Sequence, residues 1–280
     1  MIIWLASYPK SGNTWVRSMI SALSYSSDGI FNFKLIKKVS QFPEKKYFKD
    51  LINDFGDFNE IKENWIPAQE SMNLDNEIKL LKTHHGKYTV GKDSFTNDQN
   101  TLATIYIVRD PRTLISSISN HYTLAIDKAS DFLMTPQIIG NSKGWEDKET
   151  GMQCLLGKWN DHYRSWTRNK NDLLLIKYEN LIQNPKNELG KIINFLKKYV
   201  NVETNDNKNK KILETTSFKS LKEMEIKGLF KENVLNKKDD SKVNFFHLGP
   251  ANNWKDNLNG NVKNKIEKNF YDEMKELEYL

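Results

Sequence analysis

Residues 2–23 read IIWLASYPKSGNTWVRSMISAL and decide the fold of this chain. The apolar run at residues 2–6 is typical of a strand buried on both faces, as strands of parallel sheets are. Pro9 and Gly12 then break the strand, and from Thr14 onward apolar residues recur at helical spacing. The stretch therefore predicts a strand, a tight loop and the N-terminus of a helix.

Such a junction favours an anion, because the free N–H groups of a first helical turn and the helix dipole both attract negative charge. Lys10 adds a mobile positive charge, and Gly12 lets the backbone approach a ligand closely. Short polar donors come from Ser11, Asn13 and Thr14. The loop is not a Walker A motif, since the lysine here precedes the glycine. An ordinary turn with a solvated lysine is the alternative.

Other strand and helix signals follow in alternation. Buried strands are predicted at residues 78–81, 102–108 and 173–176. Two helices are expected to begin at Asp110-Pro111 and Asn184-Pro185, where an N-cap residue precedes proline in the first helical position. Strands that alternate with helices predict an α/β fold, in which a P-loop-type parallel sheet carries helices on both faces. We expect a single domain over residues 1–280, with ligands beyond the carboxyl ends of the strands.

The composition narrows the class of protein. The chain has 280 residues, a net charge of +6 and one cysteine, Cys154, which excludes a disulfide framework or a cysteine-based zinc site. The positive charge suits an anionic ligand, but we expect the charged runs at 208–211 and 237–240 to be solvated, and no nucleic-acid motif accompanies them. The first strand begins at residue 2 and no apolar run is long enough to span a bilayer. We therefore expect no signal peptide, no integral membrane association and a cytoplasmic location.

Three clusters are candidates for chemistry. Lys82-Thr83-His84-His85 follows the strand at 78–81, where a histidine can act as general base and a lysine as electrophile; a pair of surface histidines is the alternative. Arg109 ends the next strand, and with Ser117 it can hold a phosphate from two sides, unless it pairs with a carboxylate instead. Residues 245–255, FFHLGPANNWK, form a loop that can cover a base or a phosphate.

Together these stretches resemble the sulfotransferase family that uses 3′-phosphoadenosine 5′-phosphosulfate (PAPS), over nearly the whole chain. YPKSGNTW at 8–15 is similar to the family's 5′-phosphosulfate loop, YPKSGTTW. The resemblance implies that Trp15 packs against the adenine and that the 5′-phosphate is held by Lys10, Ser11, Gly12, Asn13 and Thr14. IYIVRDPRTLISS at 105–117 resembles the family's 3′-phosphate segment, which implies that Arg109 and Ser117 bind the 3′-phosphate.

Further motifs extend the resemblance. KTH at 82–84 is similar to the element that carries the family's catalytic base, which would be His84. Tyr178, in LLLIKYENL, and Thr216-Ser217-Phe218 fall where the family contacts the adenine and its neighbouring phosphate. By this resemblance the protein moves a sulfuryl group from PAPS to a hydroxyl or amine acceptor, leaving adenosine 3′,5′-bisphosphate (PAP).

In-line transfer requires that the acceptor lose a proton as it attacks sulfur, so His84 is the expected base. Lys10 and Lys82 are expected to neutralise the charge on the departing oxygens, and no metal is needed. His85 and His162 are weaker candidates. His162 shares helical spacing with Trp159 and Trp166, which is typical of a packed helix face.

The chain departs from the family in its last loop. The family typically has Arg-Lys-Gly, two residues, then Gly-Asp-Trp-Lys, where this chain has HLGPANNWK at 247–255. We still expect contacts to the nucleotide from Phe246, His247, Leu248 and Gly249, but two cations are missing, so its binding should be weaker than in the family and should depend on protonation of His247. A dimerisation motif found in animal members is also missing, which leaves the oligomeric state open.

Two other functions remain as alternatives. A P-loop kinase for a nucleotide or small metabolite would need a Gly-Lys-Ser/Thr loop and an aspartate at a strand end for magnesium, and we find neither motif. A nucleotide-binding protein without catalysis would not need both Lys10 and His84. The acceptor, a small molecule or a glycan, is left open. We expect its rim in segments 31–73, 121–158 and 227–246, with 129–151 and 227–246 as long excursions.

Overall fold

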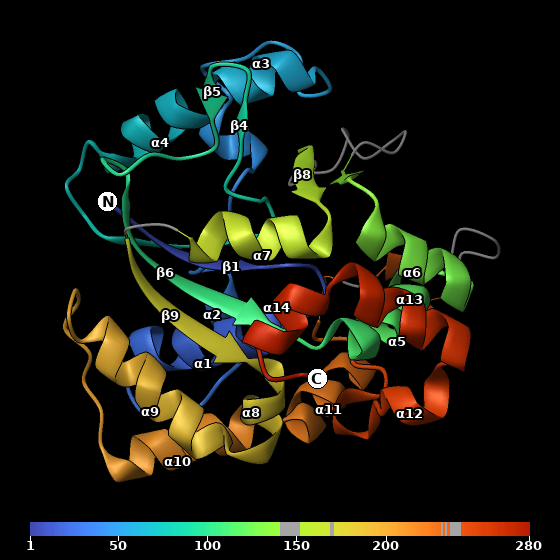
Figure 1. The fold of residues 1–280 in the computed structure, drawn as a ribbon. Coiled ribbons are helices and arrows are strands. Elements are labelled where there is room, and N and C mark those ends of the chain that lie inside the picture. Colours follow the sequence, from blue (N-terminus) through green and yellow to red (C-terminus); the bar gives the residue numbers. More distant parts are fainter. Residues whose placement is uncertain (141–151, 169–170, 231, 233, 236–241) are drawn as a thin grey trace. The chain divides into compact units, whose positions relative to one another are not determined.

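Figure 1 shows the computed structural model, which describes residues 1–140, 152–168, 171–230, 232, 234–235 and 242–280. The chain forms two compact units. Unit 1 comprises residues 1–8, 39–107 and 136–176, and unit 2 comprises residues 9–38, 108–135 and 177–280. A single domain over residues 1–280 stays a prediction.

A five-stranded sheet is the framework of unit 1. In the order β2-β3-β1-β6-β9 its strands are Ser40–Gln41, Lys79–Thr83, Ile2–Ser7, Thr101–Val108 and Asp172–Lys177. β1 pairs in parallel with β3 and β6, β2 pairs in parallel with β3, and the arrows of β6 and β9 point the same way (Figure 1). The predicted α/β fold, a parallel sheet flanked by helices, is confirmed, and the four predicted strands end within two residues of their predicted limits.

The central strand β1 is buried along its whole length, as its unbroken apolarity predicts. Its Trp4 lies beside Leu81 of β3 and Thr104 of β6. The Trp4 ring also contacts Phe42, Phe95 and Trp166, with ring centroids 5.4–6.0 Å apart. Such aromatic pairs contribute about 0.5–1.5 kcal/mol each beyond the area they bury, so this cluster fixes the start of the chain in the core of unit 1.

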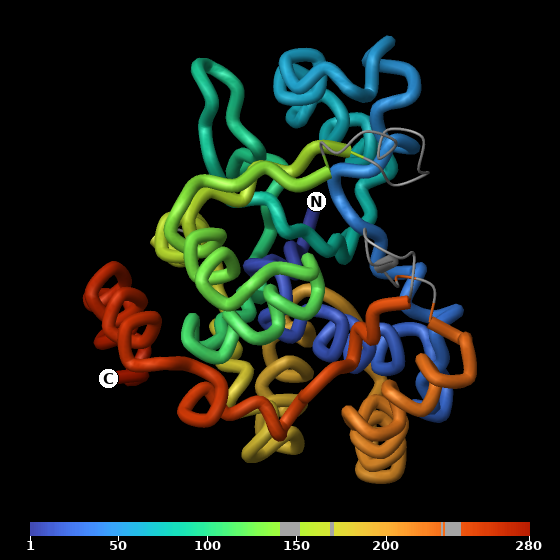
Figure 2. The backbone as a smooth tube through the Cα atoms, turned by 90° about the vertical axis from the view of Figure 1, so that its right-hand side faces the viewer, coloured from blue at the N-terminus to red at the C-terminus, as the bar shows by residue number. Residues whose placement is uncertain are grey.

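Short elements complete unit 1. Its helices are α3 (Phe58–Glu63), α4 (Trp65–Asn73) and α7 (Trp159–Thr167), with a 3₁₀ turn at Lys45–Tyr47. Helix α7 packs against β1. Two antiparallel strand pairs are β4 (Thr89–Val90) with β5 (Asp93–Ser94), and β7 (Gln137–Ile139) with β8 (Cys154–Gly157). The β4–β5 hairpin is visible as a narrow loop in Figure 2.

Unit 2 is mainly helical. Its elements are α1 (Asn13–Tyr25), α2 (Phe33–Ile36), α5 (Pro111–Tyr122), α6 (Ile126–Met134), α8 (Tyr178–Gln183), α9 (Pro185–Leu196), α10 (Asp206–Thr215), α11 (Phe218–Ile226), β10 (Val234–Leu235), β11 (Lys242–Val243), a 3₁₀ turn (Gly249–Ala251), α12 (Trp254–Asn257), α13 (Gly260–Asn269) and α14 (Tyr271–Glu276). The predicted starts of α5 and α9 are confirmed, because the side chains of Asp110 and Asn184 each accept a hydrogen bond from an N–H of the first turn.

Helix α5 organises the C-terminal part of unit 2 through Arg112, which is buried near the start of the helix. Its guanidinium pairs with Asp110 at 2.7 Å and with Glu267 of α13 at 2.5 Å. It also stacks on the ring of Trp254 in α12, 4.2 Å from the centroid. Both helices lie against α5 in Figure 1.

Parts of the expected excursions form regular helices and strands. Residues 129–134, expected as loop, belong to α6, whose Ala129 and Leu133 are buried on an amphipathic face that the weak periodicity of the region had concealed. In the second excursion, β10 and β11 form an antiparallel pair. Residues 141–151, 231, 233 and 236–241 of these excursions lie outside the described residues. No helix in the described ranges has the length and apolarity that a membrane crossing needs.

Candidate active site

The loop before α1 has the geometry of a phosphate cradle. Lys10 and Gly12 both adopt left-handed backbone, with φ of 68° and 105°. Gly12 is the N-cap of α1, and no side chain of the described part of the chain caps this helix. N–H groups of a first helical turn have no partner within the helix, so the start of α1 suits an anion.

Glycine is required at position 12 for a second reason. A Cβ atom there would lie 2.7 Å from Cδ2 of Tyr178, at the start of α8. The Tyr178 ring also contacts Trp15 of α1 edge-on, with centroids 6.1 Å apart. Unit 2 thus brings together three residues predicted to bind the nucleotide. Packing of Trp15 against the adenine stays a prediction.

Arg109 connects the two predicted phosphate sites. Its Nη1 donates to the carbonyl of Lys10 at 3.0 Å and to Oγ of Ser117 at 3.1 Å. Its guanidinium stacks on the Tyr178 ring, 4.0 Å from the centroid. Burial lowers the pKa of Arg109, and the nearby Tyr178 and Glu179 oppose this shift. The arginine is therefore fixed from three sides within unit 2.

Two buried atoms of this cluster, Ser11 Oγ and Arg109 Nε, have no hydrogen-bond partner among the described residues. An unsatisfied buried polar group costs about 1–3 kcal/mol. Oxygen atoms of a phosphate or sulfate would satisfy both. The cluster thus fits an anionic ligand.

Lys10 contacts the loop at 245–252. Its ammonium lies 3.4 Å from the ring centroid of Phe245 and 3.5 Å from the Phe245 carbonyl oxygen. Phe246 packs on Phe218 of α11, with centroids 6.1 Å apart, and its predicted contact with the nucleotide stays a prediction. A role for Phe245 could have been suspected from the FF pair, but the sequence does not indicate which ring faces the lysine.

The loop at 245–252 is held at both ends. The carboxylate of Glu225 accepts hydrogen bonds from the N–H groups of Phe245 and Phe246, at 2.6 and 2.9 Å. At the other end, Nδ2 of buried Asn252 donates to the carbonyl of Thr113 at 2.9 Å and to Oγ of Ser117 at 3.3 Å. Asn252 is a residue that the sequence analysis missed, because an isolated Asn-Asn pair carries no signal of a buried contact.

The middle of this loop contains the predicted residues His247, Leu248 and Gly249. His247 is exposed, and partial burial together with Lys222 and Lys10 lowers its pKa. Leu248 accepts a hydrogen bond from the N–H of Ala251 through its carbonyl. Gly249 has φ of 54°, and a Cβ atom there would lie 2.3 Å from the Phe218 ring. Contact of these three residues with a 3′-phosphate stays a prediction.

Thr216 and Ser217 hold helix ends. Oγ1 of Thr216 is buried and donates to the carbonyl of Ile212 at 2.6 Å, at the end of α10. Ser217 is the N-cap of α11 and accepts from the N–H of Ser220 at 3.2 Å. Their predicted contacts with the nucleotide are untested.

The predicted base, His84, lies in unit 1 directly after β3. Its Nδ1 is 2.8 Å from the Ser7 carbonyl oxygen and 3.3 Å from Ser7 Oγ. A carbonyl oxygen can only accept, so Nδ1 carries a proton, and in the neutral imidazole the lone pair is on Nε2. This is the tautomer that a general base needs at Nε2.

Two buried side chains hold the backbone of His84. Nε2 of His162, on α7, lies 3.0 Å from the His84 carbonyl oxygen, and the Tyr106 hydroxyl lies 2.8 Å from Nδ1 of His162. Burial lowers the pKa of His162 to about 4. His162 is thus neutral near pH 7, donates from Nε2 and accepts from Tyr106. The sequence analysis did not predict that Tyr106 takes part in this series of hydrogen bonds.

Lys82 and His85, which flank Thr83 and His84 in the KTHH motif, are more buried than His84. Lys82 is buried in β3, and its ammonium donates to Oε1 of Gln41 in β2 at 3.0 Å. Its role as electrophile stays a prediction. His85 stacks on Phe95 at 4.1 Å between centroids, and burial lowers its pKa to about 3, so it stays neutral and is not a surface histidine. No group of three His, Cys, Asp or Glu in the described ranges could hold a metal ion.

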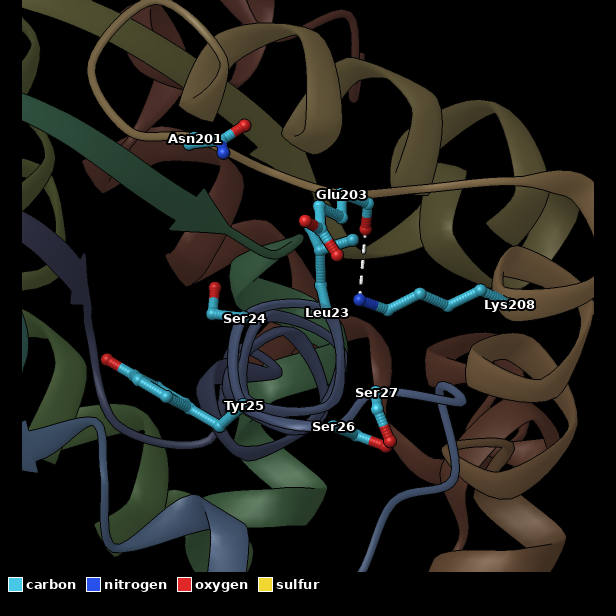
Figure 3. A pocket seen from close by; sticks show the side chains of 8 residues that line it. All are labelled: Leu23, Ser24, Tyr25, Ser26, Ser27, Asn201, Glu203 and Lys208. Carbon is cyan, nitrogen blue, oxygen red and sulfur yellow. Dashed lines mark hydrogen bonds between the residues drawn. The ribbon is translucent and has the colours of Figure 1, made fainter.

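A polar hollow of about 350 Å³ lies elsewhere in unit 2 (Figure 3). It adjoins the last turn of α1, the opposite end of that helix from the cradle. Lys208, on its wall, donates to the carbonyl of Glu203 at 2.9 Å. The C-terminal end of a helix disfavours anions, and none of the predicted site residues lines this hollow.

The motifs, the sheet and the cradle agree with a family model described as sulfotransferase domain, which matches residues 2–278. The chain therefore belongs to the sulfotransferase domain family. The predicted family and the predicted sulfotransferase activity are confirmed, and the protein is an enzyme of this class.

Similar proteins include Sulfotransferase 1 family member D1 of Mus musculus, 25% identical over 286 residues, which are 98% of this chain and 83% of the relative. Sulfotransferase 1B1 of Canis lupus familiaris is 25% identical over 259 residues, 90% of this chain and 76% of the relative. Among solved structures, mouse sulfotransferase SULT7A1 complexed with PAP has a TM-score of 0.60 at 21% identity, over 98% of this chain and 84% of that one. Retinol dehydratase in complex with retinol and PAP has a TM-score of 0.61 at 18% identity, over 98% and 81%. These two structures share the fold.

Proposed function

We propose that this sulfotransferase takes its sulfuryl group from PAPS, and that residues of unit 2 hold the nucleotide. Lys10, Ser11 and the start of α1 would bind the 5′-phosphate, and Arg109 with Ser117 the 3′-phosphate. The observation that carries the proposal is the position of Arg109, hydrogen-bonded to both Lys10 and Ser117 with Nε unpartnered among the described residues. Two similar structures, mouse sulfotransferase SULT7A1 and retinol dehydratase, are complexes with PAP, which supports the proposal.

The chemistry assigns a role to His84. Bound PAPS supplies an electrophilic sulfur and a nucleotide leaving group. Nε2 of His84 takes the proton of the attacking hydroxyl or amine, since Nδ1 is already bonded to Ser7. Lys10 neutralises charge on the departing oxygen, for which its ammonium has to leave the Phe245 ring. Lys82 would add positive charge near the acceptor.

The acceptor is proposed to be a small molecule with a hydroxyl or amine group, or a glycan. Retinol dehydratase, which is similar in structure, has been solved in complexes with retinol and with androsterone, and this supports a small hydroxylated molecule as acceptor. We further propose that the enzyme is cytoplasmic and that nucleic acid is not a partner. The segments 31–73, 121–158 and 227–246 remain the proposed rim of the acceptor site.

Equilibrium binding separates this function from the kinase alternative. PAP should bind more tightly than ATP in a calorimetric titration. Arg109→Ala should weaken PAP by roughly 1.5–3 kcal/mol, the worth of a charged hydrogen-bonded contact, with little change for AMP, which lacks the 3′-phosphate. Arg168→Ala, an exposed arginine of unit 1, is the control for loss of charge.

ATP binding as tightly as PAP would favour the kinase. Equal losses of PAP and AMP affinity in Arg109→Ala would refute the 3′-phosphate assignment. A turnover assay with a labelled sulfuryl donor and a panel of phenol, sterol, amine and sugar acceptors separates an enzyme from a protein that only binds nucleotide.

A further inference from the structure

The loop at 245–252 is fixed beside the predicted 3′-phosphate site. Glu225 holds its first two amides, Gly249 packs on Phe218, and Asn252 donates to Ser117 Oγ. Ser117 Oγ also accepts from Arg109. The loop therefore ends on the same hydroxyl that Arg109 contacts.

This loop has no permanent positive charge of its own. Its sequence, FFHLGPAN, contains no lysine or arginine. His247 is its one titratable side chain, and the lowered pKa of that group keeps it neutral near pH 7. A phosphate monoester near this loop, with a charge of about −1.5 to −2 at pH 7, needs compensation from another element.

Lys222 of α11 is placed to supply that charge. Its ammonium lies 3.3 Å from the carbonyl oxygen of His247, and it is 5.9 Å from the ring centroid of Phe218. Among the described residues no carboxylate lies within salt-bridge distance of it, so its contact is with a neutral carbonyl. In addition to partial burial, the positive charges of Lys222 and Lys10 both act on His247 and lower its pKa. The carbonyl of Lys10 in turn accepts a hydrogen bond from Arg109.

We propose that Lys222 binds the 3′-phosphate of PAPS and PAP, as the permanent cation that the loop at 245–252 lacks. The inference rests on the proposed function. A lysine ammonium has three donors on a flexible stem, so it can keep the His247 carbonyl while it turns one N–H to a phosphate oxygen. Lys219 on the same helix is exposed, and no contact is found between it and the loop in the described structure.

The test is the affinity of full-length variants for PAP and for AMP, measured by calorimetry at pH 7.5. Lys222→Ala should weaken PAP by about tenfold, the lower end for a charged hydrogen bond, and change AMP less than twofold. Lys219→Ala, the matched loss of one positive charge from α11, should change neither. Adding Leu248→Lys to Lys222→Ala should restore most of the lost PAP affinity.

Loss of PAP and AMP affinity to the same extent in Lys222→Ala would overturn the proposal, because it would indicate a structural role. An unchanged PAP affinity would overturn it as well. Should Arg109→Ala discriminate PAP from AMP while Lys222→Ala does not, the proposed function stands and only the role of Lys222 fails. Wild-type protein that does not prefer PAP to AMP would refute both.

Discussion

The phosphate cradle of unit 2 and the surroundings of His84 in unit 1 differ in whether their buried polar groups have hydrogen-bond partners. Around Arg109 the cradle gathers positive charge and leaves buried polar atoms, Ser11 Oγ and Arg109 Nε, without partners among the described residues. Around His84, Tyr106 and His162 are neutral and each is hydrogen-bonded. The first region thus has buried donors that an anion would satisfy, whereas the two side chains named in the second satisfy each other. Substitution of Arg109 in the cradle should therefore change nucleotide affinity, and substitutions around His84 should change turnover.

His84→Ala is the strongest test of this division. Loss of a general base should lower kcat by about 10²- to 10⁴-fold, while PAP affinity stays within about twofold. Steady-state kinetics and calorimetric titration of the same preparation measure both. A variant that keeps most of its rate, or that loses PAP instead, would break the division.

Tyr106→Phe tests whether the buried chain positions the base. It leaves Nδ1 of His162 without its donor. The net worth of one hydrogen bond, about 0.5–1.5 kcal/mol, corresponds to a two- to twelvefold loss in kcat. PAP affinity should not change.

Tyr163→Phe is the control for Tyr106→Phe, since that buried ring lies 5.9 Å from Tyr106. Equal losses of kcat in the two variants would point to packing alone. A lower melting temperature with unchanged kcat in Tyr106→Phe would mean that Tyr106 contributes to the stability of the protein and not to the positioning of the base.

His247→Arg should give the smallest effect. Anion binding favours the imidazolium, and the pKa of His247 is lowered in the free protein, so wild type should bind PAP more tightly as pH falls. Exposed ion pairs are worth about 0.2–1 kcal/mol, so the arginine should raise PAP affinity by up to about fivefold near pH 8 and less near pH 5.5.

The ratio of the His247→Arg variant to wild type at each pH removes the titration of the nucleotide itself. A ratio that does not depend on pH would mean that the histidine charge is not felt at the 3′-phosphate.

Much of the cradle could be predicted from the sequence because its parts are local. The strand, the break at Pro9 and the helix follow each other within residues 2–23, and the Asp110 cap is one residue from its proline. Periodicity and capping describe such neighbours directly.

The residues that were missed act over long distances. Tyr106 meets His162 across 56 positions, Asn252 meets Ser117 across 135, and Glu225 binds amides 20 and 21 positions away. No local pattern records these contacts. Helix α6 was missed for a different reason, because it has only nine residues and the polar Ser130 occupies a buried position on its apolar face.

The close approach of Gly12 to Tyr178 limits how far the loop motif can be transplanted. Eight residues, YPKSGNTW, identify the loop, yet its turn exists beside a ring that enters the fold 166 positions later. If this sequence were grafted onto another strand and helix, it would lack the Tyr178 ring, which lies against both Gly12 and Arg109. The loop motif and Tyr178 of α8 thus work together, and a design that takes an anion site from this motif has to include α8 as well.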